Sequence, residues 1–322
     1  MRALSICVLG GTGFVGSQLC GRLVRDGHAL RVLTRNRDRH RELFVLPGVE
    51  LVDANVHDPA VLAEQLRGRD AVVNLVGILN ERGRSGEGFR AAHAELARKV
   101  VAACRSAGVG RLLHMSSLRA DPAAPSHYLR SKGEAERIVR EASAALAWTI
   151  FRPSVIFGPG DSFVNRFAGL LRLFPVVPLA RAGARFAPVY VGDVVEAFAR
   201  ALGEPRTQRA TFELCGPQTY TLRELVRYVA EVLALRRHVL ALPDSLGYLQ
   251  ALVLDFVPGK PLSLDNFRSL GEDSVCSEDG LARLGVAPTP LAAVVPGYLG
   301  SRRRSVQLDE FRRVAGSRIG GV

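Results

Sequence analysis

Tyr128 and Lys132 form a pair of side chains that could move a proton to or from a substrate. Residues four positions apart lie on the same face of a helix. An ammonium beside a phenol favours the phenolate, which lowers the phenol pKa from about 10 and suits it to general acid/base chemistry. Only three of the 43 Lys and Arg residues are lysines, so Lys at 132 indicates a role that Arg cannot fill. The alternative is an exposed helix face without chemistry.

Two serines precede this pair and could assist it. Ser116 and Ser117 stand at the end of a predicted strand. Either hydroxyl could donate a hydrogen bond to a substrate oxygen, and either could simply satisfy the backbone at the strand end. The residues alone leave both serines open as candidates for binding a substrate.

A glycine-rich turn predicts where a nucleotide binds. Gly10, Gly13 and Gly16 follow an apolar run of strand length and open a helical pattern. Such glycines permit a tight turn, a close approach of backbone to a pyrophosphate, and close packing of helix on strand. Uncapped N–H groups at the helix N-terminus also attract phosphate. The other turn residues with a predicted role in this binding are Thr12, Phe14 and Val15.

Arginines near the end of the second predicted strand bear on which dinucleotide binds. An NAD site usually places a carboxylate there for the ribose 2′-hydroxyl. This sequence has Arg35 and Arg37 and no acid between Thr34 and Arg37. A guanidinium fork fits phosphate oxygens, which favours NADP(H) over NAD(H). The alternative is that an arginine-rich chain carries arginine at many positions without function.

Alternating strand and helix patterns in the first half of the chain can position these residues, as in a parallel, doubly wound sheet. The predicted strands are Ser5–Leu9, Ala29–Thr34, Val49–Val52, Ala71–Val76, Arg111–Ser116 and Trp148–Arg152. The predicted helices are Ser17–Val24, Asp58–Leu66, Ala91–Ala107 and Ser131–Ala144, the second with Asp58 as N-cap and Pro59 at its first position.

We therefore predict an α/β protein: a Rossmann-type doubly wound parallel sheet with a smaller, mostly C-terminal substrate lobe. The Rossmann domain is expected over residues 1–157, with 187–212 returning to the sheet. The lobe is expected over 158–186 and 213–300, with helices near Thr221–Leu233 and Pro243–Phe256. Residues 301–322 are expected to form a basic tail, either disordered or lying on an anionic surface.

The net charge of +12 favours a solvated basic surface over nucleic-acid binding, because the arginines are spread along the chain. Attraction to an anionic membrane surface is a third alternative. No apolar run approaches the roughly 18 residues of a membrane helix. No signal peptide is expected, because the first strand begins where its charged region would lie.

The five cysteines, Cys7, Cys20, Cys104, Cys215 and Cys276, are scattered and show no C-x-x-C spacing. This distribution favours reduced, buried thiols in a cytoplasmic protein over disulfides. It also argues against a metal site, and we expect none.

Several motifs together resemble the short-chain dehydrogenase/reductase superfamily, in its extended or atypical branch. They are the glycine turn, the Tyr128 and Lys132 pair, the run from Arg152 to Pro159 and the run from Pro188 to Val194. More narrowly, the runs 73–77, 128–132 and 156–165 are similar to the NADPH-binding accessory subunit of mitochondrial complex I and its bacterial relatives. The resemblance extends from about Leu4 to about Leu299.

The resemblance implies a role for each matching position. The glycines would hold the pyrophosphate, Arg35 and Arg37 the 2′-phosphate, and Asn55 and Val56 the adenine. Ser117, or alternatively Ser116, would bind the substrate. Tyr128 would be the general acid/base and Lys132 would hold the nicotinamide ribose. The remaining positions along the cofactor path would be Val76, Gly77, Pro153 and Val155.

Two functions follow as rival hypotheses. The first is a reductase, isomerase or epimerase acting on a small, apolar carbonyl or hydroxyl substrate, with a quinone-related compound as one option. The second is a non-catalytic NADPH-binding accessory or assembly protein of a respiratory or ubiquinone-related membrane complex, bound peripherally at the inner face of the cytoplasmic membrane. A redox-sensing regulator is a weaker third. The sequence leaves the oligomeric state open.

Overall fold

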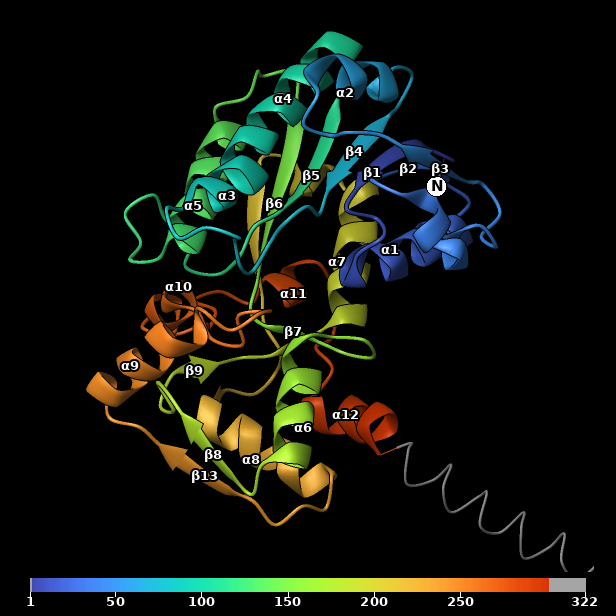
Figure 1. The fold of residues 1–322 in the computed structure, drawn as a ribbon. Coiled ribbons are helices and arrows are strands. Elements are labelled where there is room, and N and C mark those ends of the chain that lie inside the picture. Colours follow the sequence, from blue (N-terminus) through green and yellow to red (C-terminus); the bar gives the residue numbers. More distant parts are fainter. Residues whose placement is uncertain (1, 301–322) are drawn as a thin grey trace, which may run out of the picture.

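A seven-stranded parallel sheet forms the larger part of the molecule (Figure 1). The computed structural model describes residues 2–300. The strand order is β3-β2-β1-β4-β5-β6-β11. The strands are β1 (Ser5–Leu9), β2 (Ala29–Thr34), β3 (Val49–Asp53), β4 (Ala71–Asn74), β5 (Arg111–Met115), β6 (Ala147–Pro153) and β11 (Ala210–Leu214).

Helices cover both faces of this sheet, which explains why its strands are apolar on both sides. One face carries α1 (Phe14–Arg25) and α7 (Val191–Gly203), which pack against each other. The other carries α2 (Pro59–Leu66), α4 (Leu96–Ala107) and α5 (His127–Arg140). Each face has its own buried apolar cluster. The predicted α/β, doubly wound class is confirmed.

Most predicted elements of this sheet agree closely with the structure. The predicted first two strands have the observed bounds of β1 and β2. Asp58 caps α2 through its side chain, with Pro59 at the first helical position, as predicted. The segment 187–212 supplies α7 and most of β11, and β11 pairs with β6 at the edge of the sheet.

Several predicted boundaries were wrong: α1 begins at Phe14 and not at Ser17, and α5 ends at Arg140 and not at Ala144. Two further differences lie near the candidate site. Helix α5 begins at His127, four residues before the predicted start, because Ser126 accepts a hydrogen bond from Leu129 N as its N-cap. The long helix predicted from Ala91 is α4 preceded by α3 (Glu87–Arg90) and a π-helical turn, Ala91–Glu95. Both differences concern segments that border the candidate site.

The smaller lobe is built around a third apolar cluster. Its helices are α6 (Phe163–Leu173), α8 (Leu222–Val232), α9 (Asp244–Leu254), α10 (Leu264–Ser269), α11 (Gly280–Arg283) and α12 (Leu291–Leu299). Its strands form two-residue to four-residue pairs: β7 (Ile156–Phe157) with β10 (Val189–Tyr190), β9 (Arg185–Phe186) with β12 (Tyr220–Thr221), and β8 (Val176–Leu179) with β13 (His238–Ala241).

The expectation that all cysteines are reduced was wrong for one pair. Cys215 and Cys276 form a disulfide across 61 residues of sequence. It joins the residue after β11 to the segment before α11, two places that only the folded chain brings together. Cys7, Cys20 and Cys104 are free and buried, and burial raises the pKa of each thiol to about 12.

Among residues 2–300, no helix is long and apolar enough to cross a membrane. The prediction for the basic tail, 301–322, concerns residues outside the described part of the chain.

Candidate functional site

The glycine-rich turn lies at the carboxyl ends of β1 and β4, the neighbouring strands at which the strand order reverses. Ligands of open parallel sheets bind at this kind of crevice. Gly10 has a φ of +76°, and a Cβ there would lie 3.0 Å from the carbonyl carbon of Leu75. Glycine at position 10 therefore allows the β1–α1 turn to pack against the end of β4.

Gly13 and Gly16 differ in what surrounds them. A Cβ on Gly16 would lie 2.2 Å from the Gly10 carbonyl oxygen, so this glycine is required by packing within the turn. A Cβ on Gly13 would meet only that same oxygen, at 3.3 Å, and would otherwise face open space. Gly13 is also the N-cap of α1, which has no side-chain cap and no acidic residue in its first turn. Its first N–H groups can therefore bind an anion.

The three other predicted turn residues differ in how far they are buried. Val15 is buried in the core beneath the turn, so only its backbone can contact a ligand there. Phe14 is half-buried and packs on the edge of the same cluster. Thr12 is half-buried within the turn itself.

Arg35 and Arg37 have different surroundings at the end of β2. The Arg37 backbone N–H donates to Asp53 Oδ1 at 2.7 Å, and its Nε lies 3.6 Å from Asp53 Oδ2. Arg35 is exposed and makes no hydrogen bond or ion pair with the described residues. His57 follows the exposed Asn55 and the half-buried Val56 after β3, and burial, then Lys99 and to a smaller extent Arg35, lowers its pKa. Arg35 is thus the freer of the two guanidiniums.

Tyr128 lies in the first turn of α5, with its ring against Phe89 and His93. Burial raises the pKa of Tyr128, and the Ser117 hydroxyl acts in the opposite direction through its side-chain hydrogen-bonding interaction. The Ser117 Oγ does not reach full hydrogen-bond geometry with any side chain or backbone group. The structure thus places Ser117 beside the phenol, at the end of β5.

The predicted lowering of the Tyr128 pKa by Lys132 was wrong for this arrangement. Lys132 Nζ donates to the Met115 carbonyl oxygen at 3.0 Å, and burial lowers the pKa of Lys132 to about 8, with Glu136 raising it. The same ammonium borders Gly77, since a Cβ there would lie 3.2 Å from Nζ. The Lys132 ammonium therefore lies between the ends of β4 and β5. The pKa of the Tyr128 phenol is set mainly by burial.

His93, which the sequence analysis did not select, connects three elements of the site. Its Nε2 accepts a hydrogen bond from Ile78 N at 3.1 Å, and its Nδ1 lies 2.8 Å from Ser131 Oγ. Ser131 Oγ in turn donates to the Tyr128 carbonyl oxygen. Burial, then Lys132, holds the pKa of His93 well below its usual value. A neutral ring protonated on Nδ1 satisfies all three contacts and links the loop after β4 to α5.

His93 lies in the π-helical turn Ala91–Glu95, which the sequence did not predict. Such turns occur frequently at functional sites. A histidine within an alanine-rich helical pattern was the one signal in the sequence, and its partners could not be read from the spacing.

Buried polar atoms at the ends of β4 and β5 lack protein partners. His114 Nδ1 lies 3.2 Å from Asn74 Nδ2, but its Nε2 has no hydrogen-bond partner, and neither does Ser116 Oγ. Burial, then Lys132, lowers the pKa of His114 to about 3, so the ring is neutral. Buried polar groups are normally satisfied, so these atoms indicate where a polar ligand could bind.

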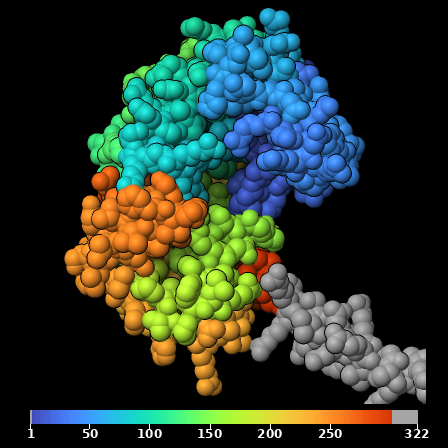
Figure 2. Space-filling model, in the orientation of Figure 1, coloured from blue at the N-terminus to red at the C-terminus, as the bar shows by residue number. Residues whose placement is uncertain are grey.

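The lobe contributes to the site through α10. Asp265 accepts hydrogen bonds from His127 N and Tyr128 N at 2.6 and 3.0 Å, which satisfies N-terminal donors of α5. Pro153 is buried at the end of β6, and the half-buried Val155 packs against the lobe cluster. These contacts leave a hollow between the blue, cyan and yellow-green parts of the molecule in Figure 2.

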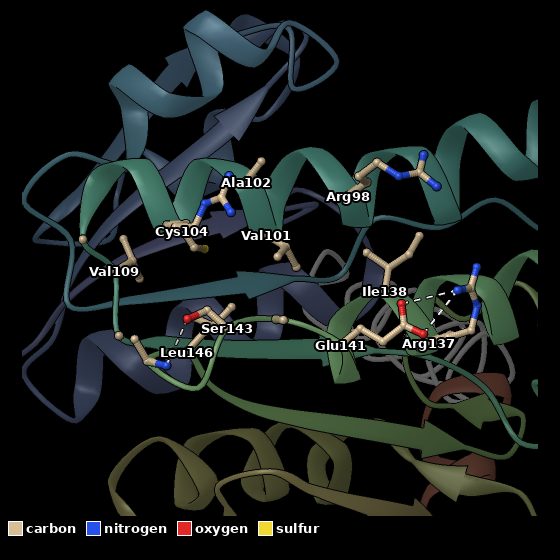
Figure 3. A pocket seen from close by; sticks show the side chains of 15 residues that line it. Arg98, Val101, Ala102, Cys104, Val109, Arg137, Ile138, Glu141, Ser143 and Leu146 are labelled. Carbon is tan, nitrogen blue, oxygen red and sulfur yellow. Dashed lines mark hydrogen bonds and ion pairs between the residues drawn. The ribbon is translucent and has the colours of Figure 1, made fainter.

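A groove of about 520 Å³ lies elsewhere, between the C-terminal halves of α4 and α5 (Figure 3). Its lining includes Gly108 to Gly110 before β5 and Leu146 before β6, so it opens at the amino ends of these strands. The groove therefore lies at the amino ends of the strands, whereas the glycine turn lies at their carboxyl ends. It does not belong to the candidate site.

The arrangement fits a nicotinamide dinucleotide. The open space at Gly13 and the uncapped N-terminus of α1 match a pyrophosphate, and the unpartnered polar atoms at the ends of β4 and β5 match another polar group of the ligand. In residues 2–300 no group of three or more His, Cys, Asp or Glu side chains could hold a metal ion.

Comparisons with known proteins give the same assignment. A family model described as NAD(P)H-binding matches residues 10–161. The chain is 30% identical to mouse NADH dehydrogenase [ubiquinone] 1 alpha subcomplex subunit 9, mitochondrial, over 88% of this chain and 76% of that protein. It is also 30% identical to a ceramide reductase of Caulobacter vibrioides, over 74% of each. The dTDP-glucose 4,6-dehydratase DesIV of Streptomyces venezuelae shares the fold, with a TM-score of 0.73 and 21% identity over 94% of this chain and 97% of that one.

Proposed function

Because this chain belongs to the extended short-chain dehydrogenase/reductase family and resembles the complex I accessory subunit, we propose that it is an NADP(H)-dependent oxidoreductase. Its substrate in this proposal is a small apolar carbonyl compound or the corresponding alcohol. The observation that carries the proposal is the meeting of Tyr128 and Ser117 at the carboxyl end of the same sheet that presents the glycine turn.

The phenol of Tyr128 suits proton donation to a substrate oxygen. Its raised pKa keeps it protonated at neutral pH, and a carbonyl being reduced needs a proton at its oxygen. Ser117 orients that oxygen by hydrogen bonding. Bound NADPH supplies the hydride. Lys132 is held at the cofactor side by Met115 O and Gly77, where its ammonium can bind ribose hydroxyls.

The preference for NADP(H) rests on Arg35. This guanidinium is exposed and unpaired among the described residues, and β2 ends without a carboxylate. A charge-assisted hydrogen bond contributes roughly 1.5–3 kcal/mol, which corresponds to at least a ten-fold difference in affinity. Calorimetric titration with NADPH and with NADH tests this preference, and equal dissociation constants contradict it.

A second candidate is a non-catalytic NADPH-binding accessory protein of a respiratory complex. The mitochondrial relative is named as a subunit of NADH dehydrogenase. In this chain burial raises the pKa of Tyr128, and the Lys132 ammonium donates to the Met115 carbonyl oxygen. NADPH absorbance, followed with quinones and ketones, distinguishes the two. Oxidation of NADPH supports the enzyme, whereas cofactor-induced thermal stabilisation without oxidation supports the accessory role.

A further inference from the structure

Helix α9 buries its small residues and exposes its large ones. Gly247 and Ala251 face the lobe, and a Cβ on Gly247 would lie 3.0 Å from the Ala180 Cβ. On the outer side, Leu246, Leu249 and Val253 are 50%, 52% and 57% exposed. A surface helix normally has the opposite arrangement. Figure 1 shows α9 at the outer edge of the lobe.

The exposed side chains continue past the end of the helix. The spacing 246, 249, 253 and 256 places them on one side of a helical path. Phe256 is 71% exposed, and Val257 and Leu79 are also exposed. We call these six residues the α9 face: Leu79, Leu246, Leu249, Val253, Phe256 and Val257.

Contacts between the lobe and the loop after β4 hold Leu79 against the lobe near this face, where its carbonyl oxygen accepts a hydrogen bond from Asn266 Nδ2 at 3.2 Å. The Arg84 Nε lies 2.8 Å from Asp255 Oδ2, and its guanidinium lies 3.7 Å from the centre of the Phe256 ring. Lys260 Nζ donates to the Gly83 carbonyl oxygen at 2.8 Å. Figure 2 shows the cyan and orange segments in contact, as these distances require.

The charges around the α9 face favour an anionic partner. No charged residue occurs between Ser245 and Leu254. Asp255 is buried and paired with both Arg84 and Lys260, so this carboxylate presents no negative charge outward. Asp244, the first residue of α9, is paired with Arg181 at 3.0 Å. Arg82 and Arg84, in the loop after β4, are both exposed, and the whole chain carries a net charge of +12.

We propose that the α9 face inserts into the surface of an anionic lipid bilayer. Leucine, valine and phenylalanine on one side of a helix, with arginine beside them, match the pattern of interfacial membrane helices. These side chains offer no hydrogen-bonding groups to a protein partner. The surrounding positive charge adds attraction to anionic headgroups.

This docking would place the mouth of the candidate site at the bilayer. Leu79 is two residues from Gly77, which borders the Lys132 ammonium. If the proposed reductase function holds, on which this step rests, the substrate is an apolar carbonyl compound dissolved in the lipid phase. The docking itself does not depend on that reaction.

Co-sedimentation of the full chain with vesicles tests the proposal. The vesicles contain phosphatidylcholine alone or with phosphatidylglycerol, and the variant is the double substitution Leu249→Gln and Val253→Gln. We expect the wild type to bind the anionic vesicles, more weakly at high salt, and the variant to bind at least ten-fold more weakly. The matched control is Val45→Gln, which alters a 79% exposed side chain between β2 and β3 and should bind as the wild type does.

Equal sedimentation of the wild type and the double variant would overturn the proposal, as would a wild type that binds no vesicles. A concentration-dependent dimer in the ultracentrifuge, lost in the variant and without vesicle binding, would instead assign the face to a second copy of the chain. NADPH affinity and melting temperature should be unchanged in the variant. Turnover of a water-soluble ketone tests the reductase separately, so the two failures are distinguishable.

Discussion

Arg35 and Arg37 are alike in sequence but differ in the interactions of their guanidiniums. Asp53 pairs with Arg37, whereas Arg35 has no partner among the described residues. A phosphate group can therefore bind the Arg35 guanidinium without first breaking an ion pair. The sequence led to the proposal that one of these arginines binds a cofactor phosphate. It could not show which one, because the ion pair that distinguishes them is a tertiary contact with Asp53 of β3.

We predict that Arg35→Ser weakens NADPH binding at least ten-fold and leaves NADH binding nearly unchanged, because one charge-assisted phosphate contact is lost. Arg37→Ser serves as the matched control and should have a smaller effect. Calorimetric titration measures both. Wild-type NADPH affinity in Arg35→Ser would place the phosphate elsewhere.

The Lys132 ammonium gives a pH-dependent contribution to stability. Burial lowers its pKa in the folded protein from the ordinary lysine value of 10.5 to about 8. Between these values the unfolded chain keeps a proton that the folded protein has lost, so the free energy of unfolding rises with pH. The rise is on the order of 3 kcal/mol.

The test compares urea unfolding of the wild type and Lys132→Met from pH 7.5 to pH 10.5. Methionine has a similar length and no charge, so any stability advantage of the variant near pH 7.5 should shrink as pH rises. A difference that stays constant over this range would show that the ammonium is not buried as described.

At the scale of elements, two glycines of the β1–α1 turn have different roles: Gly13 leaves room for a ligand, and Gly16 is required by packing. A Cβ on Gly13 would meet only the Gly10 carbonyl oxygen, at 3.3 Å, whereas a Cβ on Gly16 would lie 2.2 Å from that oxygen. We predict that Gly13→Val abolishes NADPH binding in a protein that still folds, as its circular dichroism can show, because the branched side chain occupies ligand space. Gly16→Ala, the smaller change, should lower the melting temperature. Unchanged NADPH affinity in folded Gly13→Val would contradict this placement of the cofactor.

The sequence predicted the elements of the sheet well, and physical reasons explain the exceptions. Buried parallel strands are short apolar runs, so β1 and β2 could be bounded from the sequence alone. The start of α5 was missed although its N-cap, Ser126, is a local signal. The second partner of its first N–H groups, Asp265, lies more than 130 residues away and could not be read from the sequence. The role of His93 could not be predicted either, because its partners come from the loop after β4 and from α5.

At the scale of the whole molecule, the disulfide between Cys215 and Cys276 ties β11 to the lobe. Scattered cysteines carry no pairing information, which is why the sequence indicated free thiols. We predict that replacing both by serine lowers the free energy of unfolding by about 2–4 kcal/mol, through the added entropy of the unfolded chain. Denaturation with and without reductant measures this. The reductant should destabilise the wild type and leave the double variant unaffected, and an insensitive wild type would contradict the bond.

The two lobes meet at Tyr128, where Ser117 comes from the sheet and Asp265 from α10. The proposed reductase therefore depends on one phenol that can donate a proton while the fold holds NADPH beside it. Tyr128→Phe removes the proton donor and retains the ring contacts with Phe89 and His93. Tyr248→Phe removes an exposed hydroxyl from α9 and serves as its control.

The most direct test of the proposed function is the rate of NADPH oxidation, followed by absorbance with a responsive quinone or ketone, for the wild type and these two variants. We predict that Tyr128→Phe lowers the rate by about 10²–10⁴-fold with an unchanged dissociation constant for NADPH, while Tyr248→Phe reacts as the wild type does. A rate that survives Tyr128→Phe would contradict the proposed proton donor, and a wild type that binds NADPH but oxidises it with no compound tested would contradict the oxidoreductase.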